Sequence, residues 1–203
     1  MPYRLITVGR EFGCGSGEVA ARLAQRLNWK LLDRELIDEI ARTSQLDPGA
    51  CRQADEHLDG WLHRIGKGLW SAAGEKGPAL VPVTGLDADA MVGLTRRVME
   101  DAAAAGECVI VGRGGNYLLR GRGEAFHIFV YAPRQWRIRR LTAQGMEAGA
   151  AAALLDSRDH ERMAYIRRYY NEEWPRRHFY HLMLNASLGP ETVVAAVLTA
   201  MGI

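Results

Sequence analysis

Residues 3–32 read YRLITVGREFGCGSGEVAARLAQRLNWKLL, and two patterns meet within this stretch. Residues 3–8 form a short run rich in β-branched residues that ends in glycines, which is typical of a buried parallel strand. After the glycines, Val19, Leu23 and Leu27 recur at four-residue spacing with polar residues between them. This spacing predicts an amphipathic helix of about three turns. The glycine-rich connection therefore joins the end of a strand directly to the beginning of a helix.

The rest of the chain continues this alternation of strands and helices. Short apolar segments predict further strands at residues 29–32, 108–111, 127–131 and 181–185, and helical patterns fill residues 35–43, 87–105, 133–142, 147–170 and 190–201. Parallel neighbours need a crossover connection, which is usually a helix. We therefore predict an α/β fold with a five-stranded parallel sheet, helices on both faces and ligands at the carboxyl ends of the strands.

Length and composition favour one ordinary globular domain. The chain has 203 residues, of which 48% are hydrophobic and 25% are charged. These values predict a single domain over residues 1–203 and exclude a chain that is disordered as a whole. Glycines and prolines interrupt the stretch from about residue 45 to residue 86, and we expect two short helices and a loop there, as a small helical insertion.

Charge and cysteine content exclude several classes of protein. A net charge of +2 is too small to indicate nucleic-acid binding. The three cysteines are widely spaced and form no CxxC pair, so neither a disulfide framework nor a zinc site is indicated. No segment has the roughly 18 consecutive apolar residues of a membrane helix, and the N-terminus does not read as a leader. We expect a cytoplasmic protein whose oligomeric state is open, with a homodimer among the alternatives.

The connection between the first strand and the first helix has the chemistry of a phosphate site. Backbone N–H groups of a glycine-rich turn and of the first helical turn converge there, and the helix dipole adds its positive end. Glycine lets the backbone approach the anion closely. We therefore predict a phosphate ligand; a tight turn with no ligand is the alternative. The predicted phosphate-binding residues are Gly13, Cys14, Gly15, Ser16, Gly17 and Glu18.

This loop departs from the Walker A pattern GxxxxGK[ST]. Gly9 and Gly15 are separated by five residues instead of four, and Ser16 stands where the lysine is expected. That lysine supplies a point charge on the transferred phosphate. The Ser16 hydroxyl is predicted to meet a phosphate or a magnesium ion, but it carries no charge. Arg10 is the nearest substitute cation in the sequence, and arginines from later in the chain are the other source.

Taken together, these features resemble the cytidylate kinase-like family, a branch of the P-loop nucleoside monophosphate kinases. The matching blocks are ITVGREFGCGSGEVAARLAQRL (6–27), LLDRELI (31–37), VIVGRGGNYLL (109–119), HIFVYAPRQWRIRRL (127–141) and DSRDHERMAYIRRYYNEEW (156–174). Members of this branch are similar in lacking the P-loop lysine. The resemblance implies a kinase that uses ATP and Mg²⁺ to phosphorylate a nucleoside monophosphate, with CMP and dCMP as the first candidates.

The resemblance also implies where the acceptor binds. Asp33 and Arg34 follow the second strand, where a carboxylate suits a base or ribose and an arginine suits a phosphate. Arg113 follows the strand at residues 108–111, and its planar fork matches a phosphate. The alternatives are a helix cap for Asp33 and a structural ion pair for Arg113.

A lid over the donor phosphates is implied for about residues 137–170. Arg158 and Arg162 are four residues apart on one helical face, so both can point at one anion. We predict that these two arginines and Arg10 are catalytic, because charge stabilisation dominates phosphoryl transfer. The further predicted lid residues are Arg139, Arg140 and Arg167. A solvated charged face is the alternative.

Two other functions stay open. The missing lysine favours a nucleotide-binding regulatory module that has lost catalysis. The weak match of residues 45–86, where the acceptor pocket would lie, leaves open a kinase that acts on another small-molecule acceptor.

Overall fold

The computed structural model describes residues 3–33 and 88–203. Its contacts divide the chain into two compact units, Met1–Arg34 with Met99–Ile203, and Glu35–Val98. The predicted helix at residues 35–43, the predicted insertion at about residues 45–86 and Arg34 all lie outside the described residues. The single-domain organisation therefore stays a prediction, and the account below concerns the first unit.

The first unit is built around a parallel sheet with the strand order β2-β3-β1-β4-β5. All neighbouring strands are parallel, and β1 lies between β3 and β4, so that Thr7 is level with both Ile110 and His127. The strands are β1 (Leu5–Arg10), β2 (Lys30–Leu32), β3 (Cys108–Val111), β4 (Ala125–Tyr131) and β5 (Leu182–Asn185). The five predicted strands are confirmed, and each differs from its predicted bounds by two residues or fewer at either end.

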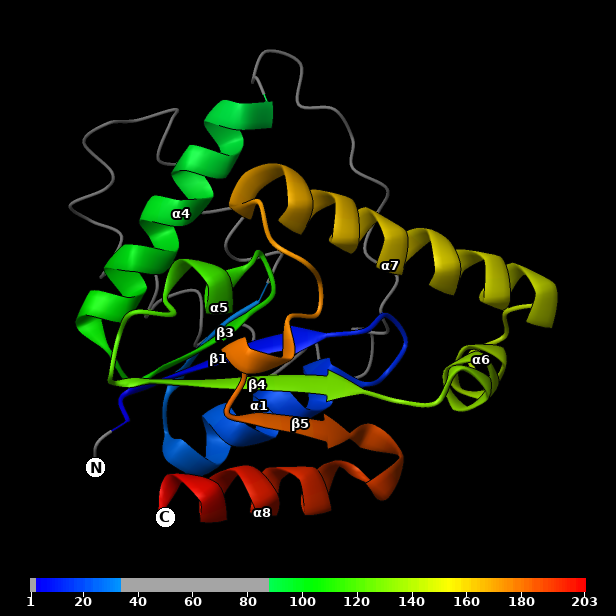
Figure 1. Ribbon diagram of the computed structural model, residues 1–203. Coiled ribbons are helices and arrows are strands. Elements are labelled where there is room, and N and C mark those ends of the chain that lie inside the picture. The colour runs from blue at the N-terminus through cyan, green and yellow to red at the C-terminus, as the bar shows by residue number, and fades with distance from the viewer. Residues whose placement is uncertain (1–2, 34–87) are drawn as a thin grey trace. The chain divides into compact units, whose positions relative to one another are not determined.

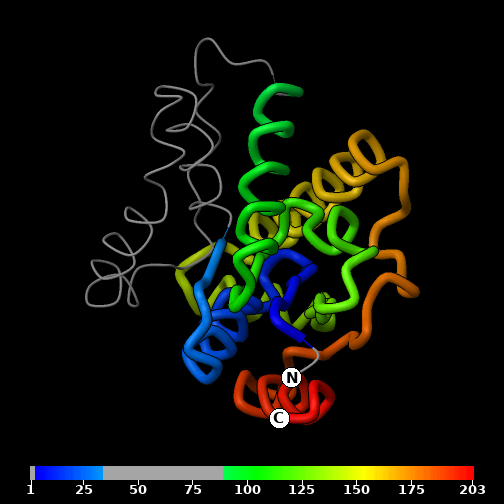
Figure 2. Tube along the Cα trace, turned by 90° about the vertical axis from the view of Figure 1, so that its left-hand side faces the viewer, coloured from blue at the N-terminus to red at the C-terminus, as the bar shows by residue number. Residues whose placement is uncertain are grey.

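Helices cover both faces of this sheet, as predicted (Figure 1, Figure 2). The helices of the described residues are α1 (Ser16–Leu27), α4 (Ala88–Ala105), α5 (Gly115–Leu118), α6 (Arg134–Thr142), α7 (Ala148–Tyr170) and α8 (Pro190–Met201), with 3-10 turns at Arg177–Phe179 and Ala186–Leu188. Of α4, only the part from Met99 onward belongs to the first unit. The sequence did not predict α5, because four residues are too few to show a helical period. The predicted α/β fold with its five-stranded parallel sheet is confirmed.

One face of the sheet packs on α1 and α8 and forms the main apolar core. Ile6, Val8 and Ile128 point from the sheet into this core, where they meet Leu23 of α1 and Val197 of α8, all nearly or fully buried. Burying an aliphatic side chain of this kind stabilises the fold by roughly 1.5–3 kcal/mol. The core therefore fixes the end of β1 against the beginning of α1, and with it the glycine-rich connection between them.

The carboxyl ends of β1 and β3 lie at the same edge of the sheet, because the two strands are parallel neighbours. The connections to α1 and to α5 both leave from this edge. α7 and α8 lie on opposite sides of the sheet in both views (Figure 1, Figure 2). No helix among the described residues is long and apolar enough to cross a membrane.

Candidate phosphate-binding site

The connection from β1 to α1 turns through two glycines with left-handed backbone. Gly13 has φ 76° and Gly15 has φ 77°, which side chains with a Cβ rarely adopt. Gly15 is the N-cap of α1, and no side chain caps the helix there. Within the described residues, α1 therefore begins without a side-chain cap, and uncapped N–H groups at helix N-termini bind anions.

Ser16, the first residue of α1, has a buried hydroxyl group that lacks a hydrogen-bond partner in the described part of the chain. Its side chain is fully buried, and its Oγ has no hydrogen-bond partner among the described residues. A buried polar group left unpaired costs about 1–3 kcal/mol. A phosphate oxygen or a Mg²⁺ ion at the loop would satisfy this hydroxyl, since Mg²⁺ prefers oxygen ligands. The predicted role of Ser16 thus gains a physical reason.

The side chains of two other predicted loop residues have partners elsewhere in the protein. The thiol of Cys14 is fully buried and donates to the carbonyl oxygen of Val130 at 3.4 Å, so it does not face a ligand. The carboxylate of Glu18 accepts from Nη2 of Arg22 at 2.7 Å on the surface of α1. Neither side chain is therefore directed at the turn, and the N–H of Glu18 donates to the carbonyl oxygen of Gly15 at 3.2 Å.

A cation from α6 lies at this turn. A Cβ built on Gly15 would lie 3.2 Å from Nε and 3.4 Å from Nη2 of Arg140, so the guanidinium rests against the glycine backbone. The φ of 77° favours glycine at this position, because residues with a Cβ rarely adopt it. Arg140 was predicted as a lid residue, and it reaches the loop one residue before Ser16. Its neighbour Arg139 is exposed.

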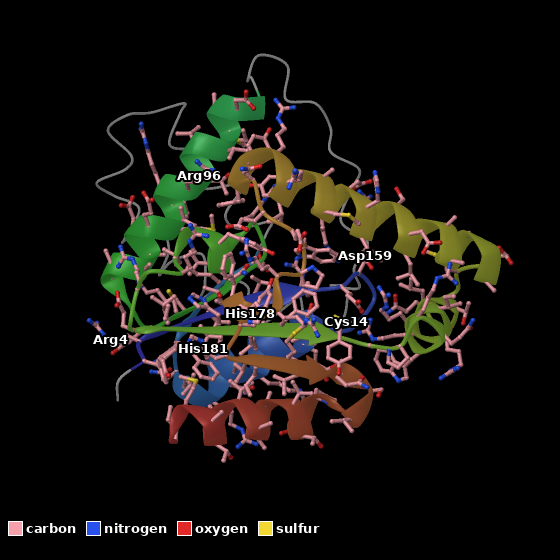
Figure 3. All side chains as sticks on the ribbon, viewed as in Figure 1. Arg4, Cys14, Arg96, Asp159, His178 and His181 are labelled. Atoms are coloured by element: carbon pink, nitrogen blue, oxygen red, sulfur yellow. The ribbon has the colours of Figure 1, made fainter. Side chains whose placement is uncertain are left out.

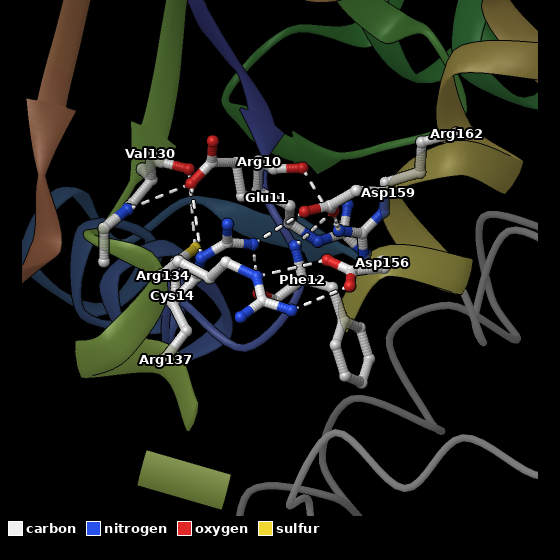
Figure 4. A network of polar contacts seen from close by, with 11 residues as sticks. Arg10, Glu11, Phe12, Cys14, Val130, Arg134, Arg137, Asp156, Asp159 and Arg162 are labelled. Atoms are coloured by element: carbon white, nitrogen blue, oxygen red, sulfur yellow. Dashed lines mark hydrogen bonds and ion pairs between the residues drawn. The ribbon is translucent and has the colours of Figure 1, made fainter. Parts of the chain in front are cut away.

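The loop is also held by a network of charged side chains from α6 and α7 (Figure 4). Asp159 accepts from the N–H of Phe12 at 2.8 Å and from Nη1 of Arg137 at 2.6 Å. Arg137 also donates to the carbonyl oxygen of Phe12 at 3.0 Å. Arg162 donates to Asp159 at 3.1 Å and to the carbonyl oxygen of Arg10 at 3.3 Å. Figure 3 places Asp159 on the side of α7 that faces the sheet.

Glu11 completes this network on the opposite side of Arg137. Its carboxylate accepts from the N–H of Ala132 at 3.2 Å and lies 3.5 Å from Nε of Arg137. Burial raises the pKa of Glu11, and the positive charge of Arg137 acts against that rise. Arg137 is only 8% exposed and lies between two carboxylates. It is therefore a buried structural cation.

A second strained turn follows β3 at the same edge. Gly112, Arg113 and Gly114 all have left-handed backbone, with φ 81°, 51° and 72°. The hydroxyl of Tyr170, the last residue of α7, donates to the carbonyl oxygen of Arg113 at 3.0 Å. The guanidinium of Arg10 lies against the backbone of Gly112. The predicted catalytic Arg10 and the predicted acceptor-binding Arg113 thus belong to neighbouring parts of one edge.

The remaining predicted site residues have different surroundings. Arg158 pairs with Glu161 at 2.8 Å, whereas Arg162 pairs with Asp159 at 3.1 Å. Arg167 lies at the C-terminal end of α7, where it lines a surface pocket with Arg176, Arg177 and His178. Asp33 directly follows β2, and Arg34 is outside the described residues. Within residues 3–33 and 88–203, no group of three or more His, Cys, Asp or Glu side chains could hold a metal ion.

Three residues that contact the loop were not among the predicted site residues. Arg137 and Asp159 stand inside the quoted arginine-rich blocks, but sequence spacing does not distinguish an arginine that contacts the loop from one that faces water. Glu11 lies inside the loop itself, and its partner comes from 126 residues further along the chain. Only the docking of α6 and α7 reveals these contacts.

Comparison with known proteins identifies a family. The sequence model of the cytidylate kinase-like family matches residues 5–188. A search of curated proteins finds no match. The resemblance read from the sequence is thereby confirmed.

Solved structures share the fold at low sequence identity. An uncharacterized protein from Eubacterium ventriosum ATCC 27560 is 18% identical with a TM-score of 0.66, and the match covers 95% of this chain and 97% of that chain. Shikimate kinase from Bacteroides thetaiotaomicron is 15% identical with a TM-score of 0.51, over 98% of both chains. A gluconokinase from Sinorhizobium meliloti 1021 is 15% identical with a TM-score of 0.52, over 99% of this chain and 92% of that chain.

Proposed function

The chain belongs to the cytidylate kinase-like family, and we propose that it transfers the γ-phosphate of ATP to a nucleoside monophosphate, with CMP and dCMP as the first acceptors to test. Family and fold support phosphoryl transfer in general. One observation carries the proposal furthest: the uncapped start of α1, the buried and unpaired Oγ of Ser16 and the guanidinium of Arg140 meet at one glycine turn.

In this proposal the backbone N–H groups of residues 13–17 hold the donor phosphates. Arg140 supplies the positive charge that the Walker A lysine supplies in other P-loop proteins, from outside the loop. The hydroxyl of Ser16 fits as one ligand of Mg²⁺, and the ion, when bound, neutralises donor phosphate oxygens. The other oxygens around it would come from phosphate and water, as is usual for Mg²⁺.

The acceptor side of the reaction is assigned to the second turn. Arg113, with Arg34 and Asp33, would orient the acceptor, and Arg162 and Arg158 would face the transferring group. In-line transfer between two bound phosphates needs positioning and charge stabilisation and no protein nucleophile. The buried thiol of Cys14 agrees with such a reaction, because it is not available for attack.

A coupled assay with ATP, Mg²⁺ and a panel of nucleoside monophosphates tests this proposal. We expect turnover with CMP or dCMP, and we expect Arg140→Ala to lower kcat about 100-fold, as the loss of one charge-stabilising group does elsewhere. Arg134→Ala is the matched control, because Arg134 lies on the same helix but pairs with Asp156 on the surface. Absence of turnover with every acceptor would contradict the catalytic proposal.

A kinase acting on another small-molecule acceptor is the second candidate. The fold similarity to a shikimate kinase and a gluconokinase favours it. Shikimate and gluconate therefore belong in the same panel, and turnover with either compound but with no monophosphate would favour this candidate.

A regulatory module that binds nucleotide without catalysis is the third candidate, and the missing lysine favours it. Calorimetry separates it from an enzyme. It predicts binding of ATP without consumption, and equal losses of binding in Arg113→Ala and Ser16→Ala.

A further inference from the structure

Asp159 is the point at which α7 is attached to the phosphate loop. One carboxylate oxygen accepts from the N–H of Phe12 at 2.8 Å and from Nη1 of Arg162 at 3.1 Å. The other oxygen accepts from Nη1 of Arg137 at 2.6 Å. Three donors, from the loop, α7 and α6, thus converge on a side chain that is 20% exposed. Hydrogen bonds of this charged kind are about twice as strong as neutral ones.

The loop segment at residues 10–12 is also held through its carbonyl oxygens. Arg137 donates to the carbonyl oxygen of Phe12, and Arg162 donates to that of Arg10. The guanidinium carbon of Arg162 lies 5.5 Å from the centre of the Phe12 ring. That ring is 7% exposed and packs in an apolar cluster with Leu155 of α7. Polar and apolar contacts therefore hold α7 against the phosphate loop.

The two arginines that Asp159 binds differ in what they can still reach. Arg137 is nearly buried between two carboxylates and donates to the loop, so it is unable to serve a ligand. The hydrogen bonds of Arg162 to other described residues use Nη1 alone, and its side chain is 26% exposed. Its Nε and Nη2 are therefore left for an anion, and two adjacent guanidinium donors match a phosphate bidentately.

We propose that Asp159 is a positioning residue, which orients Arg162 at the phosphate loop without touching substrate. The inference rests on the proposed function, in which Arg162 stabilises the transferring phosphate. Asp159 accepts from Nη1 of Arg162 and from the N–H of Phe12, so it holds this arginine and the loop segment at Phe12 in fixed positions. The remaining guanidinium donors of Arg162 are therefore oriented before a nucleotide binds. Such preorganisation acts on the transition state more than on binding.

A double-mutant cycle in the full-length protein tests this inference. The variants are Asp159→Ala, Arg162→Ala and the double variant, with kcat and KM for ATP as readouts. We expect Asp159→Ala to lower kcat at least about tenfold with less than about a threefold change in KM. Since Asp159 acts through Arg162, we expect the double variant to be no slower than Arg162→Ala. Asp156→Ala is the matched control on the same helix, and we expect it to stay within about twofold of wild type.

Further variants and readouts separate this inference from simple misfolding and from failure of the proposed function. Asp159→Asn keeps an oxygen for the Phe12 N–H but loses the charge, so we expect normal protection of that amide in hydrogen exchange together with reduced kcat. Losses that multiply in the double variant would overturn the inference, as would a faster Asp159→Ala enzyme, which would make Asp159 an inhibitory counterion.

If wild type turns over no acceptor, the proposed function fails, and the same cycle is read from the dissociation constant of a non-hydrolysable ATP analogue. Coupled losses of affinity then support the positioning role, whereas additive losses or no binding overturn it.

Discussion

Arg113 holds a backbone conformation that most residues avoid. Its φ of 51° lies in the left-handed region, which costs a residue with a Cβ roughly 1–2 kcal/mol. The glycines on either side share this conformation without that cost. Strain of this kind persists where the surrounding structure demands it, and it is concentrated at functional sites. The turn therefore presents an arginine at a position where glycine would be more stable.

Arg113→Gly should therefore separate stability from function. We expect the free energy of unfolding to rise by about 0.5–1 kcal/mol, because relief of the strain exceeds the added entropy of the unfolded chain. We also expect KM for the acceptor to rise at least about tenfold, because a bidentate phosphate contact is lost. Urea denaturation and steady-state kinetics measure the two effects.

Glu107→Gly is the matched control for this prediction. Glu107 has φ 53° but precedes β3, at the end of the strand remote from Arg113. It should gain similar stability and keep full activity. An active Arg113→Gly variant would remove Arg113 from the acceptor site.

At the scale of elements, apolar patterning predicted the strands and the long helices closely. Predicted and observed bounds agree for β3 and α8, because buried β-branched residues in one and a proline at the helix start in the other mark the ends. The side-chain partners on α7 were less predictable. Helical spacing placed Arg158 and Arg162 on one face, but Arg158 pairs with Glu161 three residues away, while Arg162 takes Asp159. Which local pair forms depends on what the helix docks against.

Sequence spacing also did not predict the contact between the end of α7 and the turn at Arg113. The hydroxyl of Tyr170 donates to the carbonyl oxygen of Arg113, and its ring leaves no room for a side chain at Gly114. These residues are distant in sequence, and no local pattern joins them. Their contact couples the position of a predicted lid helix to a predicted acceptor site.

Tyr170→Phe tests that coupling. We expect it to lower the free energy of unfolding by about 1 kcal/mol, the usual worth of one such hydrogen bond. We also expect amides of the 112–114 turn to exchange faster. Tyr131→Phe is the control, because the hydroxyl of Tyr131 makes no hydrogen bond to the part of the chain that the structure describes. Equal exchange rates in the two variants would show that the turn holds its shape without the hydrogen bond from Tyr170.

At the scale of the whole molecule, one polar pair inside the sheet makes stability depend on pH. Thr7 and His127 are level on β1 and β4, and Oγ1 of Thr7 lies 2.7 Å from Nδ1 of His127. His127 is 4% exposed and stacks on His181. Burial, followed by the charge of His181, lowers the pKa of His127 to about 4. The folded protein therefore keeps this imidazole neutral at a pH where the unfolded chain protonates it.

The sign of the effect follows from this difference in pKa. The contribution of His127 to stability is complete above the unfolded pKa of about 6.5 and is lost at up to roughly 1.4 kcal/mol per pH unit as the pH falls toward 4. Between pH 7.5 and pH 5 we expect His127→Asn, which does not titrate, to lose about 2 kcal/mol less than wild type in urea denaturation. The raised pKa of Glu11 acts in the opposite direction but is common to both proteins, so it cancels in the difference. His160→Asn, at an exposed position on α7, controls for the loss of an ordinary histidine. Parallel stability curves for wild type and His127→Asn would show that another group, and not this buried pair, makes the folded sheet sensitive to acid.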